Sequence, residues 1–454
     1  MNDLSHLKLA KFSFVLDTGE VKTAESFWHD SYLYSKKLGA AINKLGIRAT
    51  PKAVLFDSDP YTFGYKLFAL LARGCEIALP NNQQPSTLED AVSVADVVCG
   101  SAFLGVKETS TWIDGMSEVE LGEQQDEVYW PTTGTIVFFT SGSTGKSKQI
   151  RKAWQSLQLE LDILASTFEL SPVREFVSTV PHYHIYGLLF RLLLPMKLGV
   201  KIHPTKEYPE HVLPLLKTAE KNQFAMISSP AFLKRLCNDN VLASNAHAFN
   251  CIFSSGGELK SEIATKLYSQ MQLPIREIYG STESGGIAHR QQTQVSDSVW
   301  TLFEGMSISV NPDSQQLVLS SPYLNFEPLL MGDKVKVCSN GQFKLLGRID
   351  RTVKIEEKRV NLSALERTLE EHAWIQSSKV ILLEGKRSTL AAVVVLNIGN
   401  ATFESKHQLN QTLRQHLANK FELICIPKKW RYVEEFPINN QGKTTAAALE
   451  KLFE

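Results

Sequence analysis

The stretch Phe138-Phe139-Thr140-Ser141-Gly142-Ser143-Thr144-Gly145-Lys146-Ser147-Lys148 places glycines, hydroxyls and two lysines directly after an apolar run. Glycines let backbone N–H groups approach an oxyanion, hydroxyls donate further hydrogen bonds, and lysines offset negative charge. The stretch therefore predicts a loop that wraps a polyphosphate, with a flexible Ser/Gly surface turn as the alternative. A Walker A loop fits poorly, because the first glycine of GxxxxGK[ST] would fall on Thr140.

The polyphosphate loop lies in a region where short apolar runs alternate with amphipathic stretches, from Ala53 to about Phe253. This rhythm is typical of strands that feed helices in an α/β sheet. The pattern predicts strands at Lys52–Phe56, Glu76–Leu79, Thr135–Phe139 and Phe176–Val180, and helices at Thr62–Ala72, Thr87–Ala95, Trp154–Phe168 and Ile185–Leu198. The polar segment Gly105–Thr133 is expected to be a solvated loop.

The rhythm changes in the last third of the chain. Alternating runs between Trp300 and Leu346, separated by NPD and SNG turns, predict a small antiparallel β subdomain. After Asp350 the patterns predict a compact α+β unit of about a hundred residues. Its expected elements are a strand at RTVKI, a helix at Ser363–Glu371, strands near Val380 and at Ala391–Leu396, and a helix near Leu409–Phe421.

Composition describes a globular enzyme-like protein. The 454 residues, 43% hydrophobic and 21% charged with a formal net charge of +0, predict two to four folding units and do not indicate a nucleic-acid partner. The six cysteines form no CxxC pair, so neither a zinc site nor a disulfide framework is indicated. No segment offers ~18 uncharged apolar residues in a row, so we expect a cytoplasmic protein without an integral membrane segment, and weak membrane association stays open.

The polyphosphate loop resembles that of the adenylate-forming superfamily, which includes acyl-CoA synthetases, carrier-protein adenylation domains and firefly luciferase. That loop reads approximately TSGSTGxPK, and Ser147 stands here in place of its proline. The resemblance continues in order from about Ala53 to Lys443. Its further motifs are Pro181-His182-Tyr183-His184-Ile185-Tyr186-Gly187, Ser254-Ser255-Gly256-Gly257-Glu258, Tyr279-Gly280-Ser281-Thr282-Glu283, Gly332-Asp333, Gly347-Arg348-Ile349-Asp350 and Asn440-Gln441-Gly442-Lys443.

The resemblance implies a role for each matched residue. The residues implied to bind the nucleotide are Thr140, Ser141, Gly142, Ser143, Thr144, Gly145, Lys146, Lys148, Gly256, Gly257, Glu258, Tyr279, Gly280, Asp333 and Arg348. Those implied to be catalytic are Lys443, Thr282, Glu283, His184 and Lys354, with Glu283 as the Mg²⁺ ligand. Asp350 matches the hinge between a large domain, residues 1–349, and a mobile small domain, residues 350–454. For each short motif alone, an ordinary polar turn is the alternative.

The implied activity is ATP-dependent activation of a carboxylic acid to an acyl-adenylate, followed by transfer of the acyl group to a thiol. ATP and Mg²⁺ are the implied cofactors and AMP is a product. Two alternatives of other classes are a non-catalytic nucleotide-binding regulatory protein, disfavoured because Lys443, Glu283 and the loop lysines are present, and a luciferase-like oxidative enzyme.

Two departures bear on the substrates. Amino-acid-activating relatives carry an aspartate where this chain has His184, so we expect acids without an α-amino group, aryl or acyl. The stretch KIEEKRV also looks similar to ligases of aryl polyene and related carrier-protein pathways. In CoA ligases the stretch after the hinge reads K-x-x-G-x-R, and Glu357 stands here on the glycine. Its charge should disfavour free CoA, so a phosphopantetheinyl carrier protein is the expected acceptor and CoA the alternative.

Overall fold

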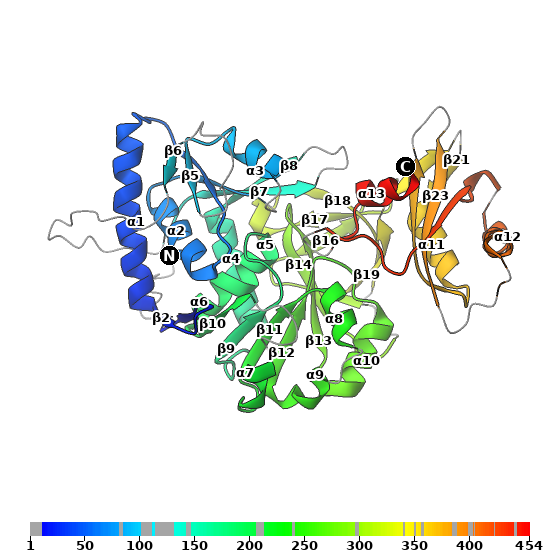
Figure 1. Cartoon of the computed structure of the whole chain (residues 1–454), viewed down its shortest axis with the longest axis horizontal. Coiled ribbons are helices and arrows are strands. Elements are labelled where there is room, and N and C mark those ends of the chain that lie inside the picture. Colours follow the sequence, from blue (N-terminus) through cyan, green and yellow to red (C-terminus); the bar gives the residue numbers. More distant parts are fainter. Residues whose placement is uncertain are drawn as a thin grey trace. The chain divides into compact units, whose positions relative to one another are not determined.

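The computed structural model divides into two compact units (Figure 1). Unit 1 comprises Met1–Ser307 and Ser320–Pro328, and unit 2 comprises Ile308–Leu319 and Leu329–Glu454. The structure describes residues 11–80, 85–100, 111–113, 131–141, 147–205, 213–237, 241–295, 299–338, 341–348, 351–355, 358–383, 388–397, 403, 405–421, 423–439 and 443–454. None of the described helices is long and apolar enough to cross a membrane.

Unit 1 contains a six-stranded sheet in the order β6-β5-β3-β4-β7-β8. Neighbouring strands are parallel except at the antiparallel β7–β8 hairpin. Its strands are β3 (Lys52–Leu55), β4 (Glu76–Leu79), β5 (Val97–Cys99), β6 (Thr111–Ile113), β7 (Thr135–Ser141) and β8 (Ser147–Ala153). The helices α2 (Pro60–Ala72) and α3 (Pro85–Val92) connect them, and the Asp59 carboxylate caps α2 by accepting from the Thr62 N–H. Strand β6 lies in the segment that we expected to be a loop.

The second sheet of unit 1 has the strand order β15-β14-β13-β12-β11-β9-β10-β1-β2. Strands β1, β10, β9, β11, β12 and β13 run parallel to one another, whereas β2 pairs antiparallel with β1, β14 with β13 and β15 with β14. The bounds are β1 (Ser13–Val15), β2 (Val21–Thr23), β9 (Glu175–Ser178), β10 (Lys201–Thr205), β11 (Phe224–Ser228), β12 (Phe249–Ser254), β13 (Ile275–Ser281), β14 (Gly285–Gln291) and β15 (Val299–Leu302).

Helices of unit 1 pack against the parallel strands of this sheet. The green helices in Figure 1 pack on the parallel strands through a cluster that includes Met226, Ile252 and Leu267. These helices are α7 (Leu213–Lys217), α8 (Pro230–Leu236), α9 (Val241–Ser244) and α10 (Ser261–Met271). Two further helices of unit 1 are α1 (Ala24–Lys44) and α4 (Trp154–Thr167). The short 3-10 turns η4 (Ala246–Ala248) and η5 (Pro322–Leu324) complete the unit.

The apolar helix expected at residues 185–198 is interrupted. It consists of α5 (Ile185–Gly187), the π-helical turn η3 (Leu188–Leu193) and α6 (Leu194–Leu198). Pro195 has no N–H to donate to the carbonyl four residues earlier, which favours a shift of the hydrogen bonds away from the α pattern. Gly199 then ends the element in the left-handed conformation, at φ 70°.

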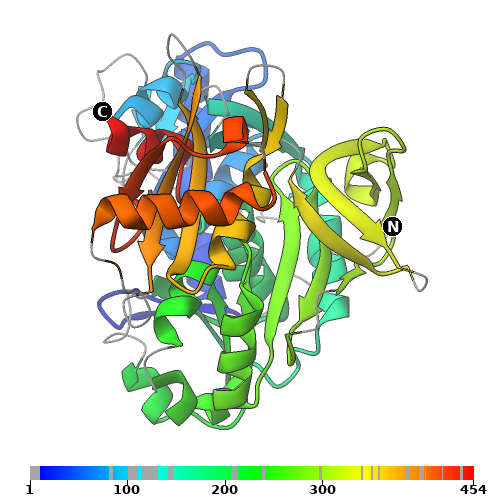
Figure 2. The same ribbon diagram turned by 90° about the vertical axis from the view of Figure 1, so that its right-hand side faces the viewer.

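Unit 2 combines a small β region with an α+β unit (Figure 2). The β region has the order β16-β17-β18-β19, with bounds β16 (Ser307–Val310), β17 (Gln316–Ser320), β18 (Leu329–Val337) and β19 (Phe343–Arg348). The α+β unit contains the hairpin β20–β21 and the sheet β22-β23-β24. Its elements are β20 (Thr352–Ile355), β21 (Lys358–Asn361), α11 (Leu362–Glu370), β22 (Ile375–Leu383), β23 (Thr389–Leu396), α12 (Lys406–Ala418), η6 (Leu423–Cys425), β24 (Lys429–Tyr432), α13 (Ala446–Glu450) and η7 (Lys451–Phe453).

The sheet β22-β23-β24 is covered on both faces. Leu365 of α11 and Leu413 of α12 share one cluster with Val394, and Leu449 of α13 joins Val393 in another. Val393 and Val394 are adjacent on β23, so their side chains point to opposite faces of the sheet. The hinge prediction at residues 349–350 lies outside the described residues, so the domain boundary there stays a prediction.

Candidate active site

The predicted polyphosphate loop joins the two strands of the β7–β8 hairpin. Thr140 pairs with Lys148 and Ser141 with Ser147 in the antiparallel register. Residues 142–146, with the predicted ligands Gly142 to Lys146, lie outside the described residues. The hairpin thus fixes where the loop leaves β7 and where it enters β8.

The end of this loop meets the YGSTE motif. The Lys148 ammonium donates to Glu283 Oε1 at 3.2 Å, across 135 residues of sequence. Burial alone would raise the pKa of the Glu283 carboxyl, but hydrogen bonds from its own backbone N–H and from Lys148 outweigh burial and lower the pKa. The structure therefore brings together two residues that the sequence assigned to one site, with Glu283 as an ionised carboxylate.

The YGSTE turn is held by hydrogen bonds between Ser281 and Ser284, the residue that follows the motif. The Ser284 hydroxyl accepts from the Ser281 N–H at 2.9 Å, and the Ser281 hydroxyl accepts from the Ser284 N–H at 3.1 Å. Just before the turn, a Cβ at Gly280 would collide with the carbonyl oxygen of Gly285, so only glycine fits there. These contacts define the backbone of Thr282 and Glu283, the two residues at the tip of the turn.

The motif Ser254–Glu258 lies beside this turn. The Ser255 hydroxyl donates to the Ile278 carbonyl at 2.9 Å, which ties the turn after β12 to strand β13. Gly256 adopts φ +84°, a conformation that favours glycine, and Gly256, Gly257 and Glu258 are exposed. The Tyr279 ring lies 5.5 Å from the Trp300 ring, centroid to centroid.

The substrate-side motif is a tight turn before α5. A side chain at Gly187 would collide with the Pro181 carbonyl, and half-buried His184 begins the helix with its ring 4.9 Å from that of Tyr183. His182 is buried instead. Its Nδ1 accepts from Arg191 Nη1 at 2.8 Å, so Nε2 carries the proton that is donated to the backbone carbonyl oxygen of residue 57, also at 2.8 Å.

His182 therefore supports the turn rather than titrating within it. Burial, together with the Arg191 charge, holds the pKa of His182 well below its usual range. The neutral imidazole connects the helical element of residues 185–198 to the end of β3. His184, the half-buried residue that precedes α5, remains the substrate-side candidate.

The remaining predicted residues lie in unit 2. Asp333 on β18 is buried and pairs with Arg348 on β19 in the antiparallel register, so these two predicted nucleotide-binding positions are opposite each other in the backbone. Lys354 pairs with Arg359 in the β20–β21 hairpin. Lys443 is exposed, and its N–H and carbonyl both bond to Asn439, at 3.0 and 2.9 Å. Asp350 and Glu357 lie outside the described residues.

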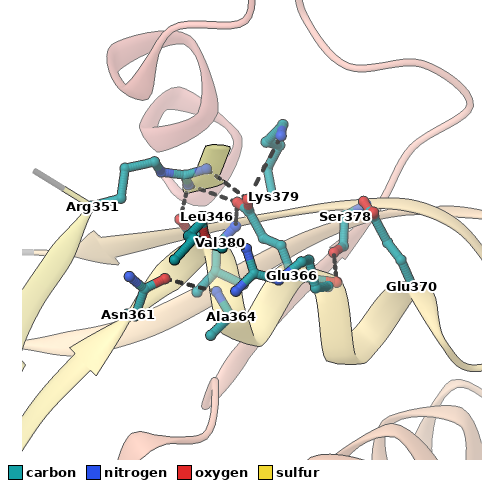
Figure 3. Close-up of polar contacts among 10 residues, drawn as sticks. Leu346, Arg351, Asn361, Ala364, Glu366, Glu370, Ser378, Lys379 and Val380 are labelled. Carbon is teal, nitrogen blue, oxygen red and sulfur yellow. Dashed lines mark hydrogen bonds and ion pairs between the residues drawn. The ribbon is translucent and has the colours of Figure 1, made fainter. Parts of the chain in front are cut away.

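The β20–β21 hairpin is fastened to the rest of unit 2 through Arg351 (Figure 3). Arg351 Nη1 and Nη2 donate to the two carboxylate oxygens of Glu366 on α11, each at 2.6 Å, and Nη2 also donates to the Val380 carbonyl at 3.0 Å. The Val380 N–H donates to the same carboxylate at 2.7 Å. Glu366 thus joins the residue before β20 to α11 and β22.

The resemblance implies Mg²⁺ at this site, and the side chains present suit it. Glu283 offers an ionised carboxylate, the hard oxygen ligand that Mg²⁺ prefers, and this ion is usually held by one or two carboxylates plus substrate phosphates. Among the described residues, no group of three or more His, Cys, Asp or Glu side chains could hold a metal by itself. The site therefore fits a Mg²⁺ that is shared with a nucleotide.

Two buried charged residues at this turn were missed by the sequence analysis. Lys152 on β8 and Glu160 on α4 both contact the segment around Glu283. The only signal was a glutamate on the apolar face of a predicted helix, between Leu157 and Leu161. Charged residues at such positions need a partner, but the sequence does not say which one.

Comparison with known proteins gives the same family. The model for the family described as AMP-binding enzyme matches residues 45–317, more than half of the chain. A 4-coumarate–CoA ligase of Halorhodospira halophila is 27% identical over 319 residues, 68% of this chain and 75% of that protein. A D-alanine–D-alanyl carrier protein ligase of Bacillus licheniformis is 22% identical over 401 residues, 79% of this chain and 78% of that protein.

Solved structures share the fold. ATP-bound MatB from Rhodopseudomonas palustris superposes with a TM-score of 0.79 at 16% identity, covering 99% of this chain and 98% of that one. MenE from Bacillus subtilis in complex with AMP gives 0.75 at 16% identity, covering 97% and 96%. The predicted α/β fold class and the prediction of an AMP-forming acid–thiol ligase are thereby confirmed. The chain belongs to the AMP-binding enzyme family.

Proposed function

We propose that this chain uses ATP to convert a carboxylic acid without an α-amino group into an acyl-adenylate, and then passes the acyl group to a phosphopantetheine thiol. The observation that carries the proposal is the 3.2 Å contact between Lys148 and Glu283. It joins the polyphosphate loop to the YGSTE turn, so groups suited to phosphate and to a metal-bound phosphate lie side by side.

The chemistry explains why these groups are needed. A carboxylate is a poor electrophile, and both the carboxylate and the α-phosphate are anionic, so catalysis rests on positioning and on neutralisation of charge. In this proposal Thr282 donates to the α-phosphate, Lys443 bridges it to the carboxylate, and His184 lies beside the carboxylate. The metal held by Glu283 would supply further neutralisation of phosphate charge.

The two half-reactions require two arrangements of the chain. We propose a large domain of residues 1–349 and a small domain of residues 350–454 that turns about Asp350. In the second arrangement Lys354 would replace Lys443 at the site. Support comes from Arg351, whose bonds to Glu366 fasten the chain to unit 2 one residue after the proposed hinge.

The acid is the first open choice. His184 is a neutral or cationic ring, which offers no carboxylate to pair with an α-ammonium, and an unpaired buried ammonium would be costly. An aryl acid such as a hydroxybenzoate is our first choice. One relative is a 4-coumarate–CoA ligase, which is compatible with an aryl acid as substrate. Another is a D-alanine–D-alanyl carrier protein ligase, which is compatible with a carrier protein as acceptor.

The acceptor is the second open choice. Glu357 stands where CoA ligases have a glycine, and its charge would repel the phosphates of free CoA more than a pantetheine arm held by a carrier protein. We therefore propose a phosphopantetheinyl carrier protein, with CoA as the alternative.

The decisive experiment is pyrophosphate exchange across a panel of aryl, acyl and amino acids, followed by transfer to a holo-carrier and to CoA. We expect exchange with an aryl or acyl acid and faster transfer to the carrier. Glu357→Gly should shift transfer toward CoA. Exchange that is fastest with an amino acid would refute the proposed substrate class, and a wild type that prefers CoA, unchanged in Glu357→Gly, would refute the proposed acceptor.

A further inference from the structure

The ionisable side chains of Lys152 and Glu160 are buried against the segment that carries the YGSTE turn. Lys152 is 5% exposed and Glu160 is 3% exposed, although charged residues are rarely buried without partners. Neither belongs to a motif that the resemblance supplied. Each contacts the backbone of the segment that carries Thr282 and Glu283.

Lys152 holds the first side of the turn. Its ammonium donates to the backbone carbonyl of Glu283 at 2.5 Å. Lys148 and Lys152 are four residues apart on β8, so they lie on the same face of the strand. Lys148 contacts the carboxylate of Glu283 and Lys152 contacts its backbone, which fixes this residue at two points from one strand.

Glu160 holds the second side. Its Oε1 accepts from the Gly286 N–H at 2.6 Å. A Cβ at Gly285 would lie 2.6 Å from Glu160 Oε2, and one at Gly286 would lie 3.2 Å from Oε1. The two glycines therefore make room for the carboxylate, and Gly285 also adopts φ +72°, which a side chain would strain.

The charges of the two residues depend on each other. Burial raises the pKa of the Glu160 carboxyl to about 7, opposed by the Gly286 N–H and by the charge of Lys152. Burial lowers the pKa of Lys152, opposed by Glu160 and Glu283. Tyr323, a further titratable group beside Glu160, has its own pKa raised by burial and by that carboxylate. Removing either charge leaves the other buried with less compensation.

We infer that Lys152 and Glu160 are positioning residues that hold the two sides of the Thr282–Glu283 turn in the geometry needed for adenylate formation. The inference rests on the proposed function, because that function gives Thr282 and Glu283 their roles. A turn held at both sides needs no reorganisation when charge develops on the α-phosphate. Loss of either hydrogen bond should therefore lower kcat more than it weakens substrate binding.

The test compares Lys152→Met, Glu160→Ala and Glu160→Gln in the full-length enzyme, by pyrophosphate exchange with the best acid of the panel. We expect Lys152→Met and Glu160→Ala to lower kcat by about 10-fold to 100-fold, with the KM for ATP within about threefold of wild type. Glu160→Gln should be intermediate, because an amide oxygen still accepts from the Gly286 N–H. A uniform rise in KM at unchanged kcat would overturn the inference.

Glu175→Gln is the matched control. Glu175 is a buried carboxylate of the same unit at the start of β9, bonded to Lys201 and His203, and it contacts no residue of the turn in these bonds. It should reduce stability while kcat stays at the wild-type value. If Glu175→Gln lowers kcat as much as Glu160→Ala does, the effect is one of general stability and the inference fails.

A second readout does not depend on the activity. Hydrogen exchange of the Gly286 amide in the nucleotide-free enzyme should be at least about tenfold faster in Glu160→Ala than in wild type and unchanged in Glu175→Gln, because the Glu160 bond protects this amide. Unchanged exchange would overturn the inference. If the wild type shows no pyrophosphate exchange with any acid, the proposed function fails, while faster Gly286 exchange would still establish that Glu160 holds the turn.

Discussion

The Arg351–Glu366 pair determines how firmly the segment after the proposed hinge is fastened to unit 2 (Figure 3). We consider Arg351→Ala, Glu366→Gln and the double variant. The guanidinium and the carboxylate share two parallel bonds of 2.6 Å, and their side chains are 29% and 7% exposed. Bidentate pairs of this kind are among the strongest hydrogen-bonded contacts in proteins.

The structure sets the expected size of the effect. Removing one partner of a buried ion pair costs about 3–5 kcal/mol. Two groups soften the loss here, since the Val380 N–H still donates to Glu366 at 2.7 Å and the Lys379 ammonium lies 3.7 Å from the carboxylate. We therefore expect Arg351→Ala to destabilise unit 2 by about 2–3 kcal/mol, with a coupling energy of about 2 kcal/mol in the double-mutant cycle.

The assay is urea-dependent hydrogen exchange of the buried β22–β23 amides in the full-length chain, which measures the opening free energy of this unit apart from unit 1. The matched control is the Lys420–Glu371 pair of the same unit, which has the same 2.6 Å separation but side chains that are 52% exposed. That pair should show no measurable coupling, because solvent screens it. Equal coupling in the two cycles would refute the argument from burial and geometry.

Three further predictions follow from the site and the core. Lys443→Ala should abolish adenylate formation while a supplied acyl-adenylate is still transferred to the thiol, and equal loss of both half-reactions would refute the hinge. Amino acids should be the slowest class in pyrophosphate exchange, because His184 offers no carboxylate to an α-ammonium. Hydrogen bonds from His203 and Lys201 outweigh burial and lower the pKa of Glu175 to about 2, below its ordinary value of 4.5. The resulting stability, about 3 kcal/mol, is present above pH 4.5 and is lost as the pH falls toward 2, so thermal unfolding of Glu175→Gln should lack this acid-sensitive step.

Elements with a clear apolar period were predictable. The strand expected at Glu76–Leu79 has those same bounds, and the helix expected at Trp154–Phe168 ends one residue earlier. In such elements the apolar residues repeat along the face that is buried, so the sequence itself shows the periodicity. Tertiary packing then alters only the ends of the helix or strand.

The predictions of two elements were wrong, because the local sequence pattern was too short or misleading. The strand Thr111–Ile113 has three residues inside a polar segment. Its parallel hydrogen bonding with β5 stabilises the extended conformation, which the local sequence pattern does not indicate. The apolar run at residues 185–198 reads as one helix, but Pro195 and the tight turn at Gly187 divide it into α and π segments. A periodic pattern does not report which hydrogen bond each residue makes.

Lys148 and Lys152 show why the sequence locates some functional residues and not others. Lys148 is 62% exposed at the end of a glycine-rich loop, and its setting is defined by the ligand that such a loop serves, so a motif can find it. Lys152 occupies the same face of the same strand, but its hydrogen bond goes to a carbonyl 131 residues away. The role of a buried charged side chain depends on the neighbouring group that compensates its charge. The tertiary structure determines which group that is. Residues that touch a ligand can therefore be predicted from a motif, whereas residues that hold those residues in place become visible only once β8, α4 and the β13–β14 turn are assembled.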